Sequence, residues 1–361
     1  MTHLLSRRFA LAIGVALLAV PPMGTASAQG CMPVRFVSPA LGGRGDAYLE
    51  ARSWRSSVAF RRLYSNMFFR GTRSHPEFAP KGQPILIHNN TVDFGLTYAV
   101  SDRVSVTLNV PYLDGFLSNF HLDSVRHETR ASGIGDVNIH VSSWLFDLQN
   151  NPRGNVALGA GVKAPTGKMN SAGTQFLANG TSIEFPNVPA IQPGDGGWGL
   201  IFQSEAFRQV ANRAFAYTSG MYTANLREST GVPRFPTGPV IMTGVPDLYS
   251  LRAGASVHLL SRSDLSPDSR TIVSASLGWR EDATTRRDLF GGRDLFYRAP
   301  ARVGYVDNGL LAMRGRYAVS INVPVRVYQN YRLSDSNIAL GSPGQGGLAR
   351  YLVLAEFSRR Y

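Results

Sequence analysis

Hydrophobic and polar residues alternate one by one over many short segments of this chain. In the clearest segment, hydrophobic side chains occupy every second position between residues 92 and 100. Successive side chains of a β-strand point to opposite faces, so this alternation predicts a strand with one apolar and one polar face. After the polar residues 101–103, the same alternation resumes over residues 104–110. Two alternating segments joined by a short polar turn predict a β-hairpin.

The same pattern recurs along the chain from about residue 50 onward. Clear segments lie at 92–100, 104–110, 137–141, 156–162, 198–202, 215–226, 251–259, 273–279, 317–327 and 351–357, and two weaker ones lie at 54–66 and 302–313. Together they predict about twelve strands, and an even number of strands is typical of bacterial outer-membrane barrels. Beyond the N-terminal region, no apolar segment reaches the about 20 residues that a transmembrane helix needs.

The predicted connections alternate between short and long. Short turns fall near residues 101–103, 150–154, 210–213, 262–269 and 314–316, and long polar segments fall near 70–88, 112–133, 165–197, 229–246, 282–301 and 332–347. Outer-membrane barrels have short periplasmic turns and longer external loops. The sequence therefore predicts an all-β protein in which residues 51–361 form a transmembrane antiparallel up-and-down β-barrel. An even strand number places both ends of the barrel on the periplasmic side.

The N-terminus predicts export. Arg7 and Arg8 precede an apolar segment at 9–20, and the small residues 26–28 form a cleavage site, a pattern typical of a secretory signal peptide. We expect residues 1–28 to be a signal peptide that is removed. The outer membrane of a Gram-negative bacterium is then the expected location of the barrel.

The mature N-terminus is expected to precede the first strand. Residues 29–50 are rich in glycine and proline, and we expect them to lie in the periplasm or to fold into the barrel lumen. Cys31 is the only cysteine, so no internal disulfide can form. A free thiol is favoured over lipidation, because glutamine at position 29 fits a lipobox poorly.

Aromatic residues mark the end of the chain and the ends of strands. Phe357 and Tyr361 lie on the apolar face of the last alternating segment. A terminal aromatic residue there resembles the signal by which the outer-membrane assembly machinery recognises its clients. Other aromatic residues are candidates for the interfacial girdles of a membrane barrel. These are Tyr98, Tyr112, Trp144, Trp198, Trp279, Tyr317, Tyr331 and Tyr351.

The chain is basic, with a net charge of +13 that becomes +11 once Arg7 and Arg8 are removed. The basic residues are spread along the chain and the protein is exported, so the charge does not predict nucleic-acid binding. The expected partners are outer-membrane lipid and lipopolysaccharide, whose phosphates attract cations, together with the assembly machinery and a small-molecule solute.

The polar face of the predicted strands is expected to line the lumen. Its charged and histidine residues are Asp93, His140, Lys163, Glu205, Arg252, His258, Arg280, Arg326 and Glu356. Charges inside a barrel must be paired or hydrated, because desolvating a lone charge is costly. Two arrangements meet this requirement: a salt-bridged, packed interior, and a polar pathway whose lining selects solutes. The sequence leaves both open.

Motifs for other chemistry fail on spacing. Residues 161–168 resemble a phosphate-binding loop, but Val162 occupies the position of the first glycine and Met169 that of the Ser or Thr,. The seven histidines are scattered and there is one cysteine, so we expect no metal site and no cofactor.

One enzymatic alternative comes from a single strand. Asn138, His140 and Ser142 share one face of a predicted strand. An outer-membrane phospholipase of about twelve strands uses a His-x-Ser pair and an Asn for acyl transfer. The further residues of that enzyme's motif do not follow, so we expect a polar stripe in the lumen and no enzyme.

Several glycine-rich segments carry a family resemblance. They are residues 95–111 (GLTYAVSDRVSVTLNVP), residues 133–137 (GIGDV) followed by 159–167 (GAGVKAPTG), and residues 193–199 (PGDGGWG). Together they resemble the meta-pathway phenol-degradation outer-membrane transporter family, over about residues 90–330. The resemblance implies a barrel that takes up aromatic or other small hydrophobic compounds, and it carries no catalytic residues.

The function expected from these observations is that of an outer-membrane channel or transporter. Small solutes, aromatic or hydrophobic compounds among them, would pass down their gradient. Passive diffusion needs no nucleotide, and no nucleotide site is present in the sequence. The alternative is a structural or surface-interaction barrel with a blocked lumen, whose loops at 165–197 and 282–301 bind partners or lipopolysaccharide.

Overall fold

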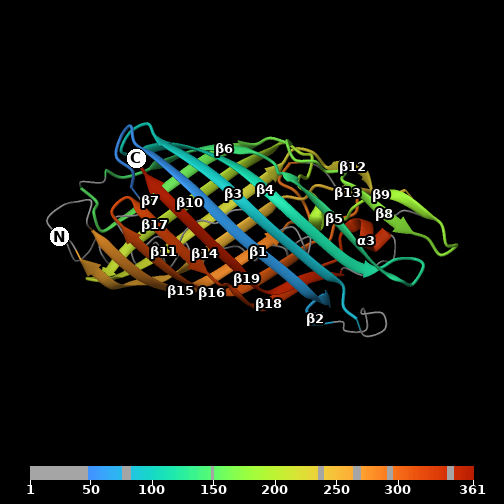
Figure 1. The fold of residues 1–361 in the computed structure, drawn as a ribbon. Helices are drawn as coiled ribbons and strands as arrows, with labels where there is room; N and C mark the ends of the chain where they lie inside the picture. The colour runs from blue at the N-terminus through green and yellow to red at the C-terminus, as the bar shows by residue number, and fades with distance from the viewer. Residues whose placement is uncertain are drawn as a thin grey trace.

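The described part of the chain forms one closed antiparallel β-barrel (Figure 1). The computed structural model describes residues 48–74, 83–147, 150–234, 240–262, 270–290, 296–339 and 345–361. The predicted signal peptide, Cys31 and all but the last three residues of the segment 29–50 lie outside these ranges.

Twelve strands form the wall. In order around the barrel they are β1 (Trp54–Arg70), β3 (Leu86–Ala99), β4 (Val104–Phe120), β5 with β6 (Arg126–Ile134 and Asn138–Trp144), β7 (Gly154–Lys163), β10 (Gly199–Ala211), β11 (Ala214–Asn225), β14 (Leu248–Arg262), β15 (Thr271–Thr284), β16 (Ala301–Arg314), β17 with β18 (Tyr317–Asn322 and Val325–Tyr331) and β19 (Gln345–Arg360). β5 and β6 pair with successive parts of β4 and count as one interrupted strand. β19 pairs with β1 and closes the ring. The predicted fold class and strand number are confirmed.

The two ends of the barrel differ in their connections. The C-terminus and the start of β1 lie at the end that carries the short turns (Figure 1), where the amide of Tyr361 donates to the carbonyl of Trp54 at 2.8 Å. Small elements occupy the long connections at the opposite end: β2 (Arg73–Ser74), β8 (Ala172–Phe176), β9 (Ser182–Pro186), η3 (Pro189–Ile191), β12 (Ser229–Pro233), β13 (Met242–Gly244) and α3 (Asp335–Ala339). No helix in the described ranges is long and apolar enough to cross a membrane.

One predicted long loop is mostly strand. The segment 112–133 was expected to be a polar connection, but β4 runs to Phe120 and β5 begins at Arg126. The backbone pairing of the two strands continues beyond the level at which their outward side chains cease to be apolar. Apolar outward side chains alternate with inward residues only where the strands face the membrane. Backbone hydrogen bonds between the strands form with or without this alternation.

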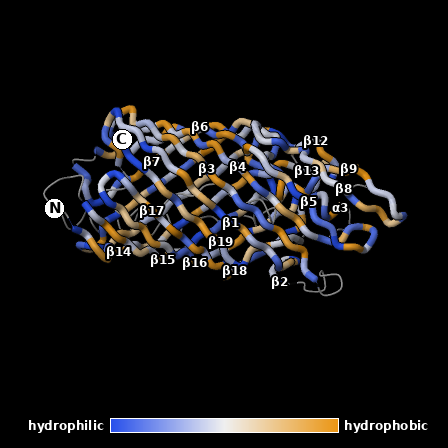
Figure 2. The backbone as a smooth tube through the Cα atoms, viewed as in Figure 1, coloured by the Kyte–Doolittle hydropathy of each residue, from blue (hydrophilic) through white to orange (hydrophobic). Residues whose placement is uncertain are grey.

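The outer face of the wall carries a hydrophobic belt. Along the strands hydrophobic and hydrophilic residues alternate (Figure 2), and the outward hydrophobic side chains are exposed, as with Phe94 at 51% and Leu277 at 61%. Tyr351 on β19 and Tyr361, the residue that follows this strand, are ten residues apart, which on a tilted strand spans about 25 Å, the height of the apolar band of membrane barrels. The protein is therefore built to span the outer membrane.

Paired residues on neighbouring strands mark the upper edge of this belt. Phe60, Val92 and Tyr112 form one row across β1, β3 and β4. Two residues further along each strand, the outward row consists of Arg62, Asn90 and Asp114. The change from apolar to polar between the two rows fixes the level at which hydrocarbon gives way to headgroups.

Candidate functional site

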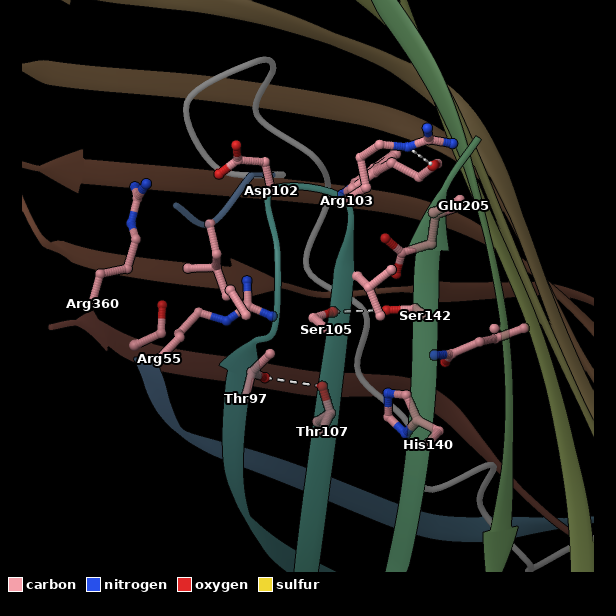
Figure 3. Close-up of a pocket in the computed structure, with 18 of the residues that line it drawn as sticks. Arg55, Thr97, Asp102, Arg103, Ser105, Thr107, His140, Ser142, Glu205 and Arg360 are labelled. Carbon is pink, nitrogen blue, oxygen red and sulfur yellow. Dashed lines mark hydrogen bonds between the residues drawn. The ribbon is translucent and has the colours of Figure 1, made fainter. Parts of the chain in front are cut away.

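Two adjoining cavities occupy the centre of the barrel. Their volumes are about 140 Å³ and about 190 Å³, each well above the roughly 10–15 Å³ that a cavity needs to hold one water molecule. The first extends to the short-turn end, and the second continues toward the long loops. They share eight lining residues: Arg55, Thr97, Thr107, His140, Gln203, Ser204, Glu205 and Glu356. The shared residues form the waist of one continuous internal space, part of which is seen in Figure 3.

Short side chains on β1, β3, β4, β6 and β7 leave this space open. Inward positions there carry Ser57, Ala59, Thr97, Ser105, Thr107, Ser142, Ala157 and Gly159. The hydroxyl groups bond across neighbouring strands, Thr97 with Thr107 and Ser105 with Ser142, each pair at 3.0 Å (Figure 3). The wall on this side of the lumen is thus polar, and its small side chains do not reach the opposite wall.

Charged groups converge at the waist from opposite walls. Glu205 lies on β10, six strands around the twelve-stranded ring from Glu356 on β19, and both side chains line both cavities. Asp93 and Glu356 flank Ala59 in the strand register, and the carboxylate of Glu356 lies within electrostatic range of Arg55, Glu205 and Asp93. The waist and the adjoining second cavity thus bring the side chains of Glu205, Glu356, Asp93 and Arg55 to one internal space.

The short-turn mouth of the lumen is lined by both charged and aromatic groups. Asp102, Arg103 and Arg360 line the first cavity there, and the amide of Ala51 donates to Asp102 Oδ1 at 2.8 Å. Tyr48 packs edge-on against Trp144, with ring centroids 4.9 Å apart. Tyr48 and Leu49 thus lie at the lumen mouth.

The other end of the cavity is closed by three of the four segments that carried the family resemblance, residues 133–137, 159–167 and 193–199. The carboxylate of Asp136 accepts the amides of Gly167 and Asp195, both at 3.0 Å. Lys163 bonds to Asp195 and donates to Asn225 Oδ1 at 2.7 Å. Since Asp136, Lys163 and Asp195 all line the second cavity, this buried network forms its roof.

Two glycines make that roof possible. Gly196 has φ +76°, a left-handed conformation that a side chain disfavours,. A Cβ at Gly194 would lie 2.7 Å from Asp136 Oδ1, so a larger residue would push the loop off the carboxylate. The resemblance motifs are therefore fold-determining, and their glycines allow the close approach of three chain segments.

The sequence-predicted lumen residues fall into two groups. Asp93, His140, Lys163, Glu205, Arg252 and Glu356 line the cavities, whereas His258, Arg280 and Arg326 do not line either one. His258 bonds to Ser274 at 2.8 Å, and Arg326 lies over the ring of Phe69 at 4.3 Å. These three residues belong to the packed part of the interior.

On β14 to β16 the interior charges form salt bridges. Arg252 contacts Asp307 at 2.7 Å, and Arg280 contacts Asp282 at 2.9 Å. Arg252 lies in one register row with Arg280 and Tyr305, and Asp307 lies two residues beyond Tyr305, so the guanidinium reaches Asp307 diagonally across β15. This side of the lumen has the salt-bridged packing that was one of the two predicted arrangements.

Most girdle candidates lie on the outer face of the barrel. Exposed on that face are Tyr112, Trp198, Trp279, Tyr317 and Tyr351. Tyr98 is half-buried against Trp54, with centroids 4.5 Å apart. The assembly-signal candidates Phe357 and Tyr361 are 47% and 55% exposed.

Two girdle candidates point inward, and for them the prediction is wrong. Trp144 has the same strand parity as His140 and packs on Tyr48 and Phe207 inside the barrel. Tyr331 is 3% exposed, and its hydroxyl donates to the carbonyl of Gly347. A bulge in β18 opposite Gly304 and Tyr305 reverses the alternation before Tyr331, and a regular strand pattern cannot reveal such a bulge.

The arrangement gives no support to the phospholipase alternative. Ser142 bonds to Ser105 at 3.0 Å, and Asn138 accepts from Asn109 at 3.2 Å. In the described structure Ser142 bonds to Ser105 and not to His140, the partner that would activate a serine nucleophile,. Among the described residues no cluster of three or more His, Cys, Asp or Glu side chains is arranged to hold a metal ion.

Sequence reasoning missed several cavity residues. Arg55, Gln203, Asp102, Arg103 and Arg360 line the lumen without having been singled out. Arg55 alternates with the outward residues Trp54 and Val58, so strand parity alone could have identified it. Small residues at inward positions, such as Ala59, were the unused signal for where the lumen is open.

Comparison with known proteins identifies the fold. No protein-family model and no curated protein matches the sequence. Among solved structures, an outer membrane channel from Pseudomonas putida F1 aligns over 90% of this chain and 100% of its own, with 10% identity and a TM-score of 0.53. The β domain of the Bordetella autotransporter BrkA aligns over 86% of this chain and 100% of its own (10% identity, TM-score 0.46). A Pseudomonas aeruginosa FadL homologue aligns over 93% and 99% (10% identity, TM-score 0.40).

At this level of identity the likeness to the Pseudomonas putida channel concerns the fold alone, and the two lower scores add no argument. Together with the hydrophobic belt and the closed ring, the shared fold establishes that this chain is an outer-membrane β-barrel.

Proposed function

We propose that this protein is an outer-membrane channel for the passive passage of small solutes. The observation that carries the proposal is the continuous polar space at the centre of the closed barrel, which extends from the short-turn mouth to the roof formed by Asp136, Lys163 and Asp195 and consists of two cavities with eight lining residues in common. Its hydroxyl and charged lining offers hydrogen bonds to a hydrated solute, as the walls of water-filled pores do.

Each cavity is close in volume to a cavity that holds one benzene molecule, about 150 Å³. A single-ring solute of the kind that the family resemblance implies therefore fits by size, and polar substituents would favour it over a plain hydrocarbon. The Pseudomonas putida structure is described as a channel, which agrees with this proposal.

Liposome swelling tests the proposal. Gln203 projects into both cavities and its neighbour Phe202 is 44% exposed on the outer face, so a tryptophan at either position adds similar bulk to opposite faces of one strand. We expect small neutral polar solutes to enter liposomes that contain the wild type or Phe202→Trp, and to enter much more slowly with Gln203→Trp.

The blocked-barrel alternative predicts a different result. Its support is the packed half of the lumen and the aromatic contacts of Tyr48 at the mouth. If the wild type shows the heat-modifiable gel mobility of a folded barrel and the liposomes remain impermeable to every solute, the channel proposal is wrong.

A further inference from the structure

One polar side chain at the waist makes no hydrogen bond within the described part of the chain. His140 lies on β6, is 8% exposed and lines both cavities (Figure 3). Its Nδ1 is buried without a partner, and no described group bonds to its Nε2. From this ring and the walls beside it, we infer that the waist binds small solutes that combine an apolar ring with a hydroxyl or carbonyl oxygen. The inference rests on the proposed function and deepens it by assigning the solute class and the residue that recognises it.

The surroundings of the two ring nitrogens decide which of them carries the proton. A neutral imidazole has one N–H donor and one acceptor nitrogen. A proton on Nδ1 of His140 would be a buried donor without an acceptor, which is costly, whereas Nε2 is open to the cavity. The stable neutral form therefore has its proton on Nε2, and this N–H can donate to an oxygen atom of a solute in the lumen.

Two inward glycines on β7 keep the wall beside this ring free of side chains. Gly161 lies opposite His140 in the strand register, and a Cβ there would lie 2.4 Å from the Cβ of His140. Gly159 lies opposite Gln203, and a Cβ there would lie 2.8 Å from Nε2 of Gln203. The Gln203 amide also has no hydrogen-bond partner among the described residues, and it lines both cavities. It therefore offers a second donor and an acceptor to a solute at the waist.

The wall that continues from this polar pair is apolar. Ile201 lies in the register row of His140, two strands away, and Met221 and Leu248 line the second cavity from β11 and β14. Burial of an apolar ring against these side chains is favourable. A plain hydrocarbon would displace water from the His140 N–H and the Gln203 amide without replacing its hydrogen bonds, which is unfavourable. A solute with both an apolar ring and an oxygen satisfies both walls.

Isothermal titration calorimetry of the purified barrel in detergent tests the inference without requiring passage. The probes are benzyl alcohol and toluene, which share a ring and differ by one hydroxyl group. His140→Phe keeps a flat ring at the waist and removes both nitrogens, and Gln203→Leu removes the amide. We expect each variant to bind benzyl alcohol at least about five-fold more weakly than the wild type does, as for the loss of one neutral hydrogen bond. Toluene is expected to bind no more weakly to either variant than to the wild type.

His88→Phe is the matched control, because it makes the same exchange on β3 outside the cavities, where His88 contacts Tyr64 and Phe116. It should leave both affinities unchanged. The inference is overturned if benzyl alcohol does not bind to the folded wild type, or if either folded variant retains the wild-type affinity for it. An equal loss of toluene binding also overturns it, because His140 would then act through its shape alone. A wild type that binds benzyl alcohol but leaves liposomes impermeable to every solute refutes the channel proposal and retains the site.

Discussion

The strands on the two sides of the lumen have the same alternation of inward and outward residues, but their inward charged side chains have different surroundings. On β14 to β16, inward charges are buried in salt bridges, with the Arg252 and Asp307 side chains 4% and 1% exposed. On the side from β1 to β10, Glu205 lines the central cavities. The difference lies in the size of the neighbouring inward residues. Small residues leave room for water, and large ones bring charged groups into contact.

This comparison separates structural charges from functional ones. A charge in the packed half stabilises the barrel only together with its partner, because removal of one partner leaves a buried ion. A charge in the open half is already hydrated, so its removal costs little stability and changes the field that a solute meets. Substitutions on the two sides should therefore have different effects, and this expectation can be tested.

The largest effect is expected for Asp307→Ala. This substitution leaves the Arg252 guanidinium buried without the carboxylate it contacts at 2.7 Å, and we expect the free energy of unfolding to fall by about 3–5 kcal/mol. Urea titration in lipid or detergent, followed by gel mobility, measures the loss. The matched control is Arg286→Ala, which removes a part-exposed pair with Asp335 and should cost at most about 1 kcal/mol. Equal losses for both variants would contradict the distinction.

A smaller effect on stability is expected for Glu205→Gln. Because the Glu205 carboxylate faces the cavity and other carboxylates, we expect the free energy of unfolding to change by less than about 1 kcal/mol, as for an exposed charge. The same titration measures it. A loss of unfolding free energy as large as that of Asp307→Ala would show that Glu205 belongs to the packed interior. It would contradict the distinction between the two sides of the lumen.

The smallest effect concerns pH at the external end. The amide of Phe176 on β8 donates to Nδ1 of His121 at 3.2 Å, so that nitrogen must be unprotonated. Burial, and then the adjacent His127, lowers the pKa of His121, whereas Asp123 opposes this shift. The contact is therefore fully present above the ordinary histidine pKa of about 6.5. It is lost as pH falls through the lowered value.

Hydrogen exchange in the hairpin of β8 and β9 measures this effect. We expect its amides to exchange faster in acid than at neutral pH, relative to the intrinsic rates, in the wild type. In His121→Phe this acid dependence should disappear. Protection of residues 172–186 that does not vary with pH in the wild type would show that the histidine contact does not hold the hairpin.

The strands of the barrel wall could be predicted because the hydrophobicity of their residues has a period of two. A strand in hydrocarbon must place apolar side chains outward at every second residue, and this requirement identified even the weaker segments that became β1 and β16. The strand extensions beyond the membrane were missed, because residues such as Asp114 no longer obey the alternation there. Backbone pairing continues between β4 and β5 at that level, together with inward packing of Leu117 and Ala131.

The site was only partly predictable, because it depends on register. Strand parity assigned Glu205 and Glu356 to the lumen, but whether two inward charges meet depends on which residues lie opposite each other. Arg252 contacts Asp307 on the second strand along, two residues off its own register row, and Tyr331 turns inward only because of a bulge. Such irregularities arise from tertiary contacts, which a single-sequence pattern does not contain.

The central claim is that the small-residue side of the lumen is an open passage. Single-channel recording of the wild type, Gln203→Trp and Phe202→Trp in planar bilayers tests it most directly. The account predicts stepwise currents for wild type and Phe202→Trp and a strongly reduced step for Gln203→Trp. Steps of equal size from all three proteins, or no current from a folded wild type, would contradict it.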